Sequence, residues 1–225
     1  MSILRNLYQA LYSNLIADGA YMRIIKGCIY TVLIFAVALL VGLVLAALFT
    51  FLRTSTHKFL RAVGSGCAFL MKGTPVYLAL YLWYYSFLSQ MRRGELLIAI
   101  LALGIYAGGH LTDILTRAVR KESEIRSEAV ARRARKEFFT AVVPFVTEQS
   151  LFEIKRMSCI LLQLSTFVGL IGINDVAQVL ITNGFRNRAP FFAIGCAIVF
   201  YLVLQLILEI IFALLGRKLT GEEEE

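Results

Sequence analysis

The chain has 225 residues, of which 59% are hydrophobic and only 17% are charged, and its mean hydropathy is +0.73. Soluble domains are about half apolar and about a quarter charged, so this composition excludes an ordinary soluble protein and is typical of one membrane domain. The net charge of +8 does not point to nucleic acid, because the cations lie at the ends of apolar runs and no zinc-finger or aromatic RNA-binding motif is present.

Residues 1–23 predict an amphipathic lead-in helix. Apolar and aromatic side chains recur there at helical spacing, at Leu4, Leu7, Tyr8, Leu11, Tyr12 and Leu15. The pattern fits a helix on the membrane interface or a helix packed against the spans. The stretch from Met1 to Asp18 lacks the continuous apolar core of a cleavable signal.

A spanning helix needs about 20 mostly apolar residues. Five stretches meet this need and predict an all-α polytopic membrane protein with its termini on opposite sides: Gly27 to Leu52, Ala62 to Met91, Leu96 to Leu115, Met157 to Ile173, and Ala189 to Gly216. Small residues at four-residue spacing in the first and third spans allow close helix approach, at Ala38, Gly42 and Ala46 and at Gly104 and Gly108.

The second span is interrupted by Lys72 and by Gly73-Thr74-Pro75. Broken helices are tolerated at membrane depth where they line a cavity or pack against protein, so this break fits either a pathway element or an ordinary proline kink. We expect the Lys72 ammonium to extend to the membrane interface.

A basic segment separates the third and fourth spans. It carries eight Lys and Arg residues between Arg117 and Lys136. Connections longer than about 12–15 residues are usually functional or disordered, and this one is rich in strong helix formers. It is either a solvated positively charged loop or a helix on which a soluble partner docks.

The distribution of positive charge predicts the orientation. One set of connections holds thirteen Lys and Arg, including the basic segment, and the other set holds seven. The positive-inside rule therefore places the central loop and C-terminus in the cytoplasm and the N-terminus outside. Residues 219–225 form an acidic tail that we expect to be solvated.

Several polar side chains lie within the expected spans. Asp113 and His110 are candidates for function, or for an ion pair with Arg117. Gln163, Ser165 and Thr166 either hydrogen-bond between helices or line a pathway. We expect Glu209 to reach the cytoplasmic interface.

Three sets of residues resemble the permease subunits of ABC importers for polar amino acids. Lys72-Gly73-Thr74-Pro75 followed by Tyr84-Tyr85 is similar to that family's Arg-Gly-Thr-Pro motif and its tyrosines. Gln163-Leu-Ser-Thr-Phe, then Ile171-Gly-Ile and Asp175, is similar to its later motif. The cytoplasmic coupling loop of the family resembles residues 117–144, with Glu128-Ala129-Val130 for Glu-Ala-Ala, Ala134 for a Gly, and Val143-Pro144 for Leu-Pro.

The resemblance implies a type I ABC importer permease over residues 24–218 in a bacterial inner membrane. Two permease subunits, identical or different, would form one pathway, and an external binding protein would deliver an amino acid. Glu128, Ala129, Ala134 and Pro144 would contact a cytoplasmic ATPase dimer, while the translocation pathway would draw on Thr74, Pro75, Tyr85, Asp113, Gln163, Ser165 and Thr166.

No phosphate-binding loop occurs in the sequence, so ATP with Mg²⁺ is expected on the partner ATPase, and no cofactor, metal site or catalytic residue is expected on this chain. Two alternatives stay open on the residues alone. One is a channel or facilitator for small solutes that works without ATP, and the other is a regulatory membrane subunit without transport activity.

Overall fold

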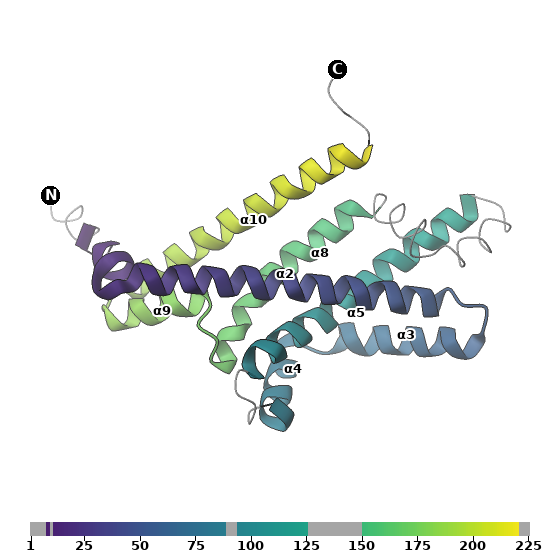
Figure 1. Cartoon of the computed structure of the whole chain (residues 1–225), viewed down its shortest axis with the longest axis horizontal. Coiled ribbons are helices and arrows are strands. Elements are labelled where there is room, and N and C mark those ends of the chain that lie inside the picture. Colours follow the sequence, from purple (N-terminus) through teal and green to yellow (C-terminus); the bar gives the residue numbers. More distant parts are fainter. Residues whose placement is uncertain (1–7, 10, 89–93, 126–149, 221–225) are drawn as a thin grey trace, which may run out of the picture.

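The computed structural model describes residues 8–9, 11–88, 94–125 and 150–220, and the regular elements within these ranges are all helical (Figure 1). In chain order these are η1 (Tyr12–Ile16), η2 (Ala17–Gly19), α2 (Ala20–Arg53), α3 (Lys58–Gly73), α4 (Val76–Trp83), η3 (Tyr84–Leu88), α5 (Gly94–Ile125), α8 (Leu151–Leu164), η5 (Ser165–Ile171), α9 (Val176–Arg186) and α10 (Pro190–Thr220). The expected all-α fold class is thereby confirmed for the described part of the chain.

The lead-in joins α2 through a sharp bend. Asp18 and Gly19 both have positive φ, at 52° and 68°, which ends the preceding turns and lets α2 start at Ala20. The π turn η1 and the 3-10 turn η2 form the part of the predicted lead-in from Tyr12 to Gly19, and residues 1–7 of it lie outside the described residues.

A row of small residues lets α2 and α5 pack closely. The buried face of α2 includes Ala38, Gly42 and Ala46. A Cβ atom added to Gly42 would lie 2.9 Å from the Ala107 Cβ, and one added to Gly104 would lie 2.8 Å from a Val41 methyl. Neither position has room for a side chain, so the close approach predicted from the small-residue spacing is confirmed.

The second expected span is two helices with a break between them. Thr74 and Pro75 are extended, because the ring of Pro75 disfavours helical geometry at the preceding residue and supplies no N–H. The Thr74 hydroxyl donates to the Leu70 carbonyl at 2.8 Å, which caps the freed end of α3. The predicted interruption is thus confirmed.

Four stretches are long and apolar enough to cross a membrane within the described residues: Tyr12–Arg53, Gly94–Arg120, Leu151–Ile171 and Pro190–Arg217. The second expected span, which the sequence predicts to be interrupted, is not among them. The pair α3 and α4 takes the place of the second span, since neither helix alone has the necessary length.

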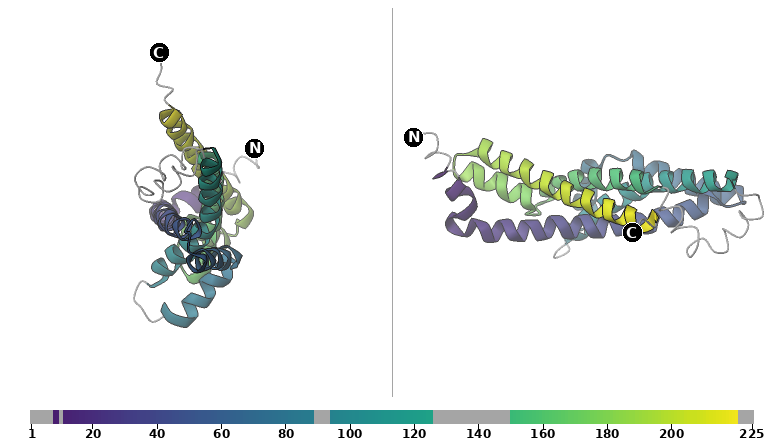
Figure 2. Two further views of the ribbon diagram at one scale, coloured as in Figure 1. Left: turned by 90° about the vertical axis from the view of Figure 1, so that its right-hand side faces the viewer. Right: turned by 90° about the horizontal axis from the view of Figure 1, so that it is seen from above.

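The long helices lie roughly along one axis, with distinct ends (Figures 1 and 2). The start of α2 lies beside α9 at one end, and the last turns of α5 lie at the other end. The helix α10 begins near α9 and diverges from α2 toward the opposite end (Figure 1). Only 6% of its most apolar stretch is buried, compared with 61% for α5, so most of α10 needs lipid or another protein to cover it.

The close packing of α2 on α5 generates a prediction. Replacing Gly42 by Leu forces the two helices apart, and we expect it to destabilise the fold by about 1–3 kcal/mol. A lower midpoint of thermal unfolding in detergent measures the effect. Gly195→Leu is the matched control, because a Cβ there meets no atom within 4 Å. Equal midpoints for the two variants would contradict the close contact.

Candidate functional site

A strip of polar side chains crosses the surface where α8 meets α10. The Gln163 amide donates to the Gln205 side-chain oxygen at 3.4 Å, and Gln163 is exposed. The Thr166 hydroxyl, at the start of η5, donates to the Gln163 carbonyl at 2.8 Å. The two amides are therefore held together on a surface that is otherwise apolar.

Charged groups extend this strip along both helices. Glu209 lies one helical turn beyond Gln205, is exposed, and makes no ion pair or hydrogen bond within the described residues. Lys155 lies two turns before Gln163 on α8, and Cys159 lies between them, within electrostatic range of Lys155 and Glu209. We call the group formed by Lys155, Gln163, Thr166, Gln205 and Glu209 the α8–α10 strip.

The α8–α10 strip is costly if lipid covers it. An ionised carboxylate near the centre of a bilayer costs about 2.5–3.5 kcal/mol on insertion scales, and such residues usually face protein or water. Sequence reasoning placed Glu209 at the interface and did not select Gln205. Their four-residue spacing in an otherwise apolar helix was the available signal, because it puts both on one face.

Ser165 does not belong to this surface. It is buried, and its hydroxyl donates to the Leu162 carbonyl at 2.7 Å. Three polar residues of the fourth span were expected to line a pathway. Gln163 and Thr166 lie in the α8–α10 strip, whereas Ser165 lies in the core.

The break between α3 and α4 carries a second exposed group. Thr74 and Pro75 are exposed, and the Tyr85 ring is 72% exposed. Tyr85 stacks on Tyr81 with centroids 6.1 Å apart and meets Tyr84 edge-on at 5.2 Å. The Tyr77 ring lies 6.4 Å from that of Phe167, so α4 approaches η5 and the end of the strip.

Asp113 lies apart from both groups, in an ionic cluster that joins three helices. Its carboxylate accepts a hydrogen bond from the Arg53 guanidinium at the end of α2 and one from the Lys72 ammonium on α3, the latter at 2.5 Å. Asp113 is 21% exposed and Arg53 is 19% exposed, so the cluster is largely shielded from solvent. Its net charge is +1, and it ties α2, α3 and α5 together.

One expectation about this cluster was wrong. Asp113 does not pair with Arg117, whose guanidinium instead donates to the Glu153 carboxylate on α8. Four residues place Asp113 and Arg117 near one face of α5, but Asp113 lies beside Arg53 and Lys72, whereas Arg117, one turn further along, lies beside Glu153 of α8. The Lys72 ammonium pairs with the Asp113 carboxylate, and its expected extension to the membrane interface stays a prediction.

The expected ATPase contacts, Glu128, Ala129, Ala134 and Pro144, lie outside the described residues. The segments that flank them are described: α5 ends at Ile125 and α8 starts at Leu151. The ion pair between Arg117 and Glu153 joins these two helices near that end.

At the opposite end, Asp175 connects three helices. Its carboxylate accepts hydrogen bonds from the Gln178 and Ala177 amides and so caps α9. It also accepts one from the Tyr201 hydroxyl of α10 at 3.0 Å, while the Val176 amide donates to the Thr31 hydroxyl of α2 at 3.2 Å. Burial raises the pKa of the Asp175 carboxyl, and these hydrogen bonds oppose the rise.

Comparison with known proteins gives a likeness to a solved structure. No family model matches the sequence, and no curated protein matches it. Among solved structures, the chain is similar to one described as the crystal structure of an amino acid ABC transporter with histidines, with a TM-score of 0.69. The likeness covers 88% of this chain and 94% of that chain at 21% sequence identity. The chain therefore has the fold of that transporter chain, as the motif resemblance implied.

The ionic cluster generates a prediction about stability. Asp113→Asn leaves Arg53 and Lys72 facing each other without a counter-charge, and we expect it to lower the free energy of unfolding by about 1–3 kcal/mol. Unfolding in detergent measures the loss. Adding Lys72→Met should recover part of it, because the net charge of the cluster returns to +1.

The matched control for this prediction is Glu153→Gln. It breaks the exposed ion pair with Arg117, so its effect should stay below about 1 kcal/mol. If Asp113→Asn and Glu153→Gln lower the free energy of unfolding equally, the cluster has no special structural role. The same conclusion follows if Lys72→Met recovers none of the loss caused by Asp113→Asn.

Proposed function

We propose that this chain is a permease subunit of an ATP-driven importer of a polar amino acid. The observation that carries the proposal is the shared fold with an amino acid ABC transporter over 88% of the chain. The motif at Lys72-Gly73-Thr74-Pro75 supports it, because the interruption that it encodes is a real break between two helices.

We place the translocation pathway at the α8–α10 strip, between this chain and a second permease subunit. Two features support this placement. The strip offers amide, hydroxyl and carboxylate groups that can hydrogen-bond an amino-acid zwitterion, and α10 is the least buried spanning helix among those described. A second subunit would cover α10 and remove Glu209 from lipid. The exposed break at Thr74 and Pro75, with Tyr85, would lie along the same route.

The central loop would couple ATP hydrolysis on a partner ATPase to transport. We propose that residues 117–144 hold the contact with an ATPase dimer, with Glu128 and Ala129 at the interface and Ala134 and Pro144 shaping the segment. ATP with Mg²⁺ would bind and be hydrolysed on that partner, while this chain has a transport role and no catalytic one. The Asp113 cluster would pass force from α5 to α2 and α3, since it joins their ends by charge-assisted bonds.

The proposed setting is a bacterial inner membrane, with the central loop and the C-terminus in the cytoplasm. The end formed by α9 and the start of α2 would then face outward, where a binding protein delivers the amino acid. The excess of Lys and Arg in the central loop supports this orientation.

The coupling proposal predicts a specific loss. Glu128→Lys reverses a charge at the proposed ATPase contact, and we expect ATP-driven uptake in liposomes to fall about tenfold or more. The reconstituted complex with its ATPase and binding protein is the sample. The matched control is Glu222→Lys in the acidic tail, which is the same charge reversal on the proposed cytoplasmic side of the membrane. It should leave uptake intact. Uptake that proceeds without ATP, or that survives Glu128→Lys, would favour a channel or facilitator instead.

The pathway proposal predicts which face of α10 is wetted in the assembled complex. In a background without the four native cysteines, Gln205→Cys and Glu209→Cys should react with a water-soluble thiol reagent. Val203→Cys and Ile207→Cys are matched controls, because they lie on the opposite face of the same helix, exposed to lipid, and should react slowly. Equal reaction at all four positions would contradict the placement, whatever the coupling test shows.

A further inference from the structure

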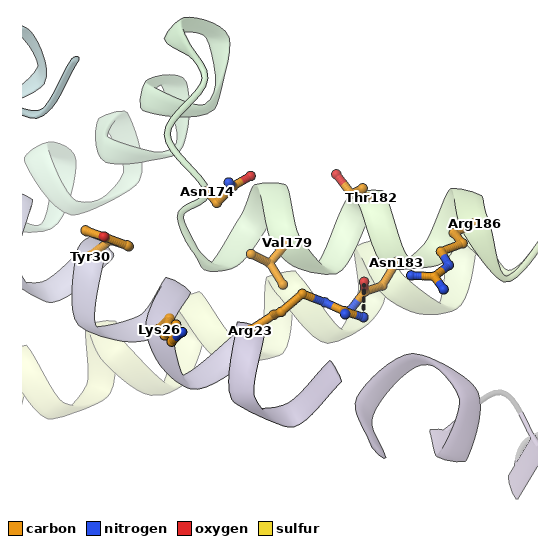
Figure 3. A pocket seen from close by; sticks show the side chains of 8 residues that line it. All are labelled: Arg23, Lys26, Tyr30, Asn174, Val179, Thr182, Asn183 and Arg186. Atoms are coloured by element: carbon orange, nitrogen blue, oxygen red, sulfur yellow. Dashed lines mark hydrogen bonds between the residues drawn. The ribbon is translucent and has the colours of Figure 1, made fainter. Parts of the chain in front are cut away.

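A basic pocket lies between the first turns of α2 and the helix α9 (Figure 3). It has a volume of about 350 Å³. Three cationic side chains line it, those of Arg23 and Lys26 on α2 and Arg186 on α9. Asn174 and Thr182 add uncharged polar groups from the neighbouring segment and from α9. The proposed translocation pathway at the α8–α10 strip does not include this pocket.

The cations are only partly compensated. The Arg23 guanidinium donates to the Asp18 carbonyl at 3.1 Å and to the Asn183 amide oxygen at 3.4 Å. Arg186 pairs with the Asp18 carboxylate at 3.3 Å. Lys26 makes no hydrogen bond or ion pair within the described residues. Three positive charges and one negative charge leave +2 at the pocket, which suits an anion.

The pocket continues into an apolar stripe along α2. Residues spaced three or four apart share one face of a helix, and from Lys26 this face runs through Tyr30 to Leu33, Val37 and Leu40. These four side chains are exposed, at 45%, 40%, 36% and 62%. Charge is followed by an aromatic ring and then by aliphatic side chains, which is the order in which a membrane presents headgroup, interface and hydrocarbon.

We propose that the pocket binds the headgroup phosphate of an anionic phospholipid, whose acyl chain lies along the stripe from Tyr30 to Leu40. Guanidinium and ammonium groups together bind phosphate by charge-assisted hydrogen bonds. The adjoining stripe distinguishes a lipid from a free anion, which would gain nothing from aliphatic contacts.

Contacts between the start of α9 and α2 fix the two walls of the pocket. The Val176 amide bonds Thr31 of α2, and a Cβ added to Gly27 would lie 3.0 Å from the Val176 backbone. The start of α9 is thereby fixed against α2, so Arg23 and Arg186 keep their spacing without a ligand. A pre-formed site loses little entropy on binding.

The test uses the full-length chain in detergent, titrated with phosphatidylglycerol while the midpoint of thermal unfolding is followed. We expect phosphatidylglycerol to raise the midpoint and phosphatidylcholine to do so much less. Lys26→Gln should weaken the apparent affinity for phosphatidylglycerol about fivefold. Its midpoint without lipid should not change, because Lys26 has no partner to lose among the described residues.

Two further variants make the test specific. Leu33→Ser shortens the apolar stripe and should also weaken the binding of phosphatidylglycerol. Arg188→Gln removes an exposed cation at the same end that does not line the pocket, and it should bind the lipid as the unaltered chain does. If Arg188→Gln weakens binding as much as Lys26→Gln, the effect is general surface charge and the site is refuted.

Competition by soluble anions distinguishes a lipid headgroup from a free phosphate as the ligand of the pocket. Glycerol 1-phosphate and inorganic phosphate share the headgroup chemistry but lack acyl chains, so we expect them to compete only weakly. If either binds as tightly as phosphatidylglycerol and Leu33→Ser has no effect, the pocket takes a soluble anion and the lipid proposal is wrong. Equal stabilisation by phosphatidylglycerol and phosphatidylcholine would also overturn it.

Discussion

The close contact of α2 with α5 is the constraint on which the arrangement of the other helices depends. Gly42, Gly104 and Gly108 allow the two backbones to approach so closely that a Cβ atom at any of these three positions would not fit. Within a membrane, helices gain little from burying apolar surface, so close packing of small residues is a principal source of association. The contact also sets the register, because the Thr50 hydroxyl reaches the Thr112 carbonyl at 3.4 Å and Arg53 comes beside Asp113.

On either side of this contact, different hydrogen bonds and ion pairs hold the helices together at the two ends of the molecule. Near the central loop, the Asp113 carboxylate holds Arg53 and Lys72 and so joins α2, α3 and α5. Around α9, the Asp175 carboxylate caps that helix and accepts a hydrogen bond from the Tyr201 hydroxyl of α10. The Val176 amide donates a hydrogen bond to the Thr31 hydroxyl of α2. Between these ties, α10 is left largely uncovered with the α8–α10 strip on its flank. The proposed pathway and the proposed lipid site therefore lie on different surfaces.

Features that depend on near neighbours along the chain were predictable from sequence. The break at Thr74 and Pro75 follows from the stereochemistry of proline, and the small-residue row follows from helical periodicity. The pairing of Asp113 was not predictable in the same way. Its nearest cation in sequence is Arg117, but α5 carries the two side chains to different neighbours, and the partners come from residues 60 and 41 positions away.

The helical membrane fold, the positions of the long apolar helices and the break in the second expected span could all be read from the sequence. These properties depend on composition, periodicity and backbone chemistry within a few turns of helix. Which polar groups meet depends on the folded arrangement: Asp113 with Arg53 and Lys72, Gln163 with Gln205, and Arg23 and Lys26 with Arg186 around one pocket. A helix rotates by about 100° per residue, so a partner depends on how each helix is turned and which one lies opposite, and both are set by long-range packing.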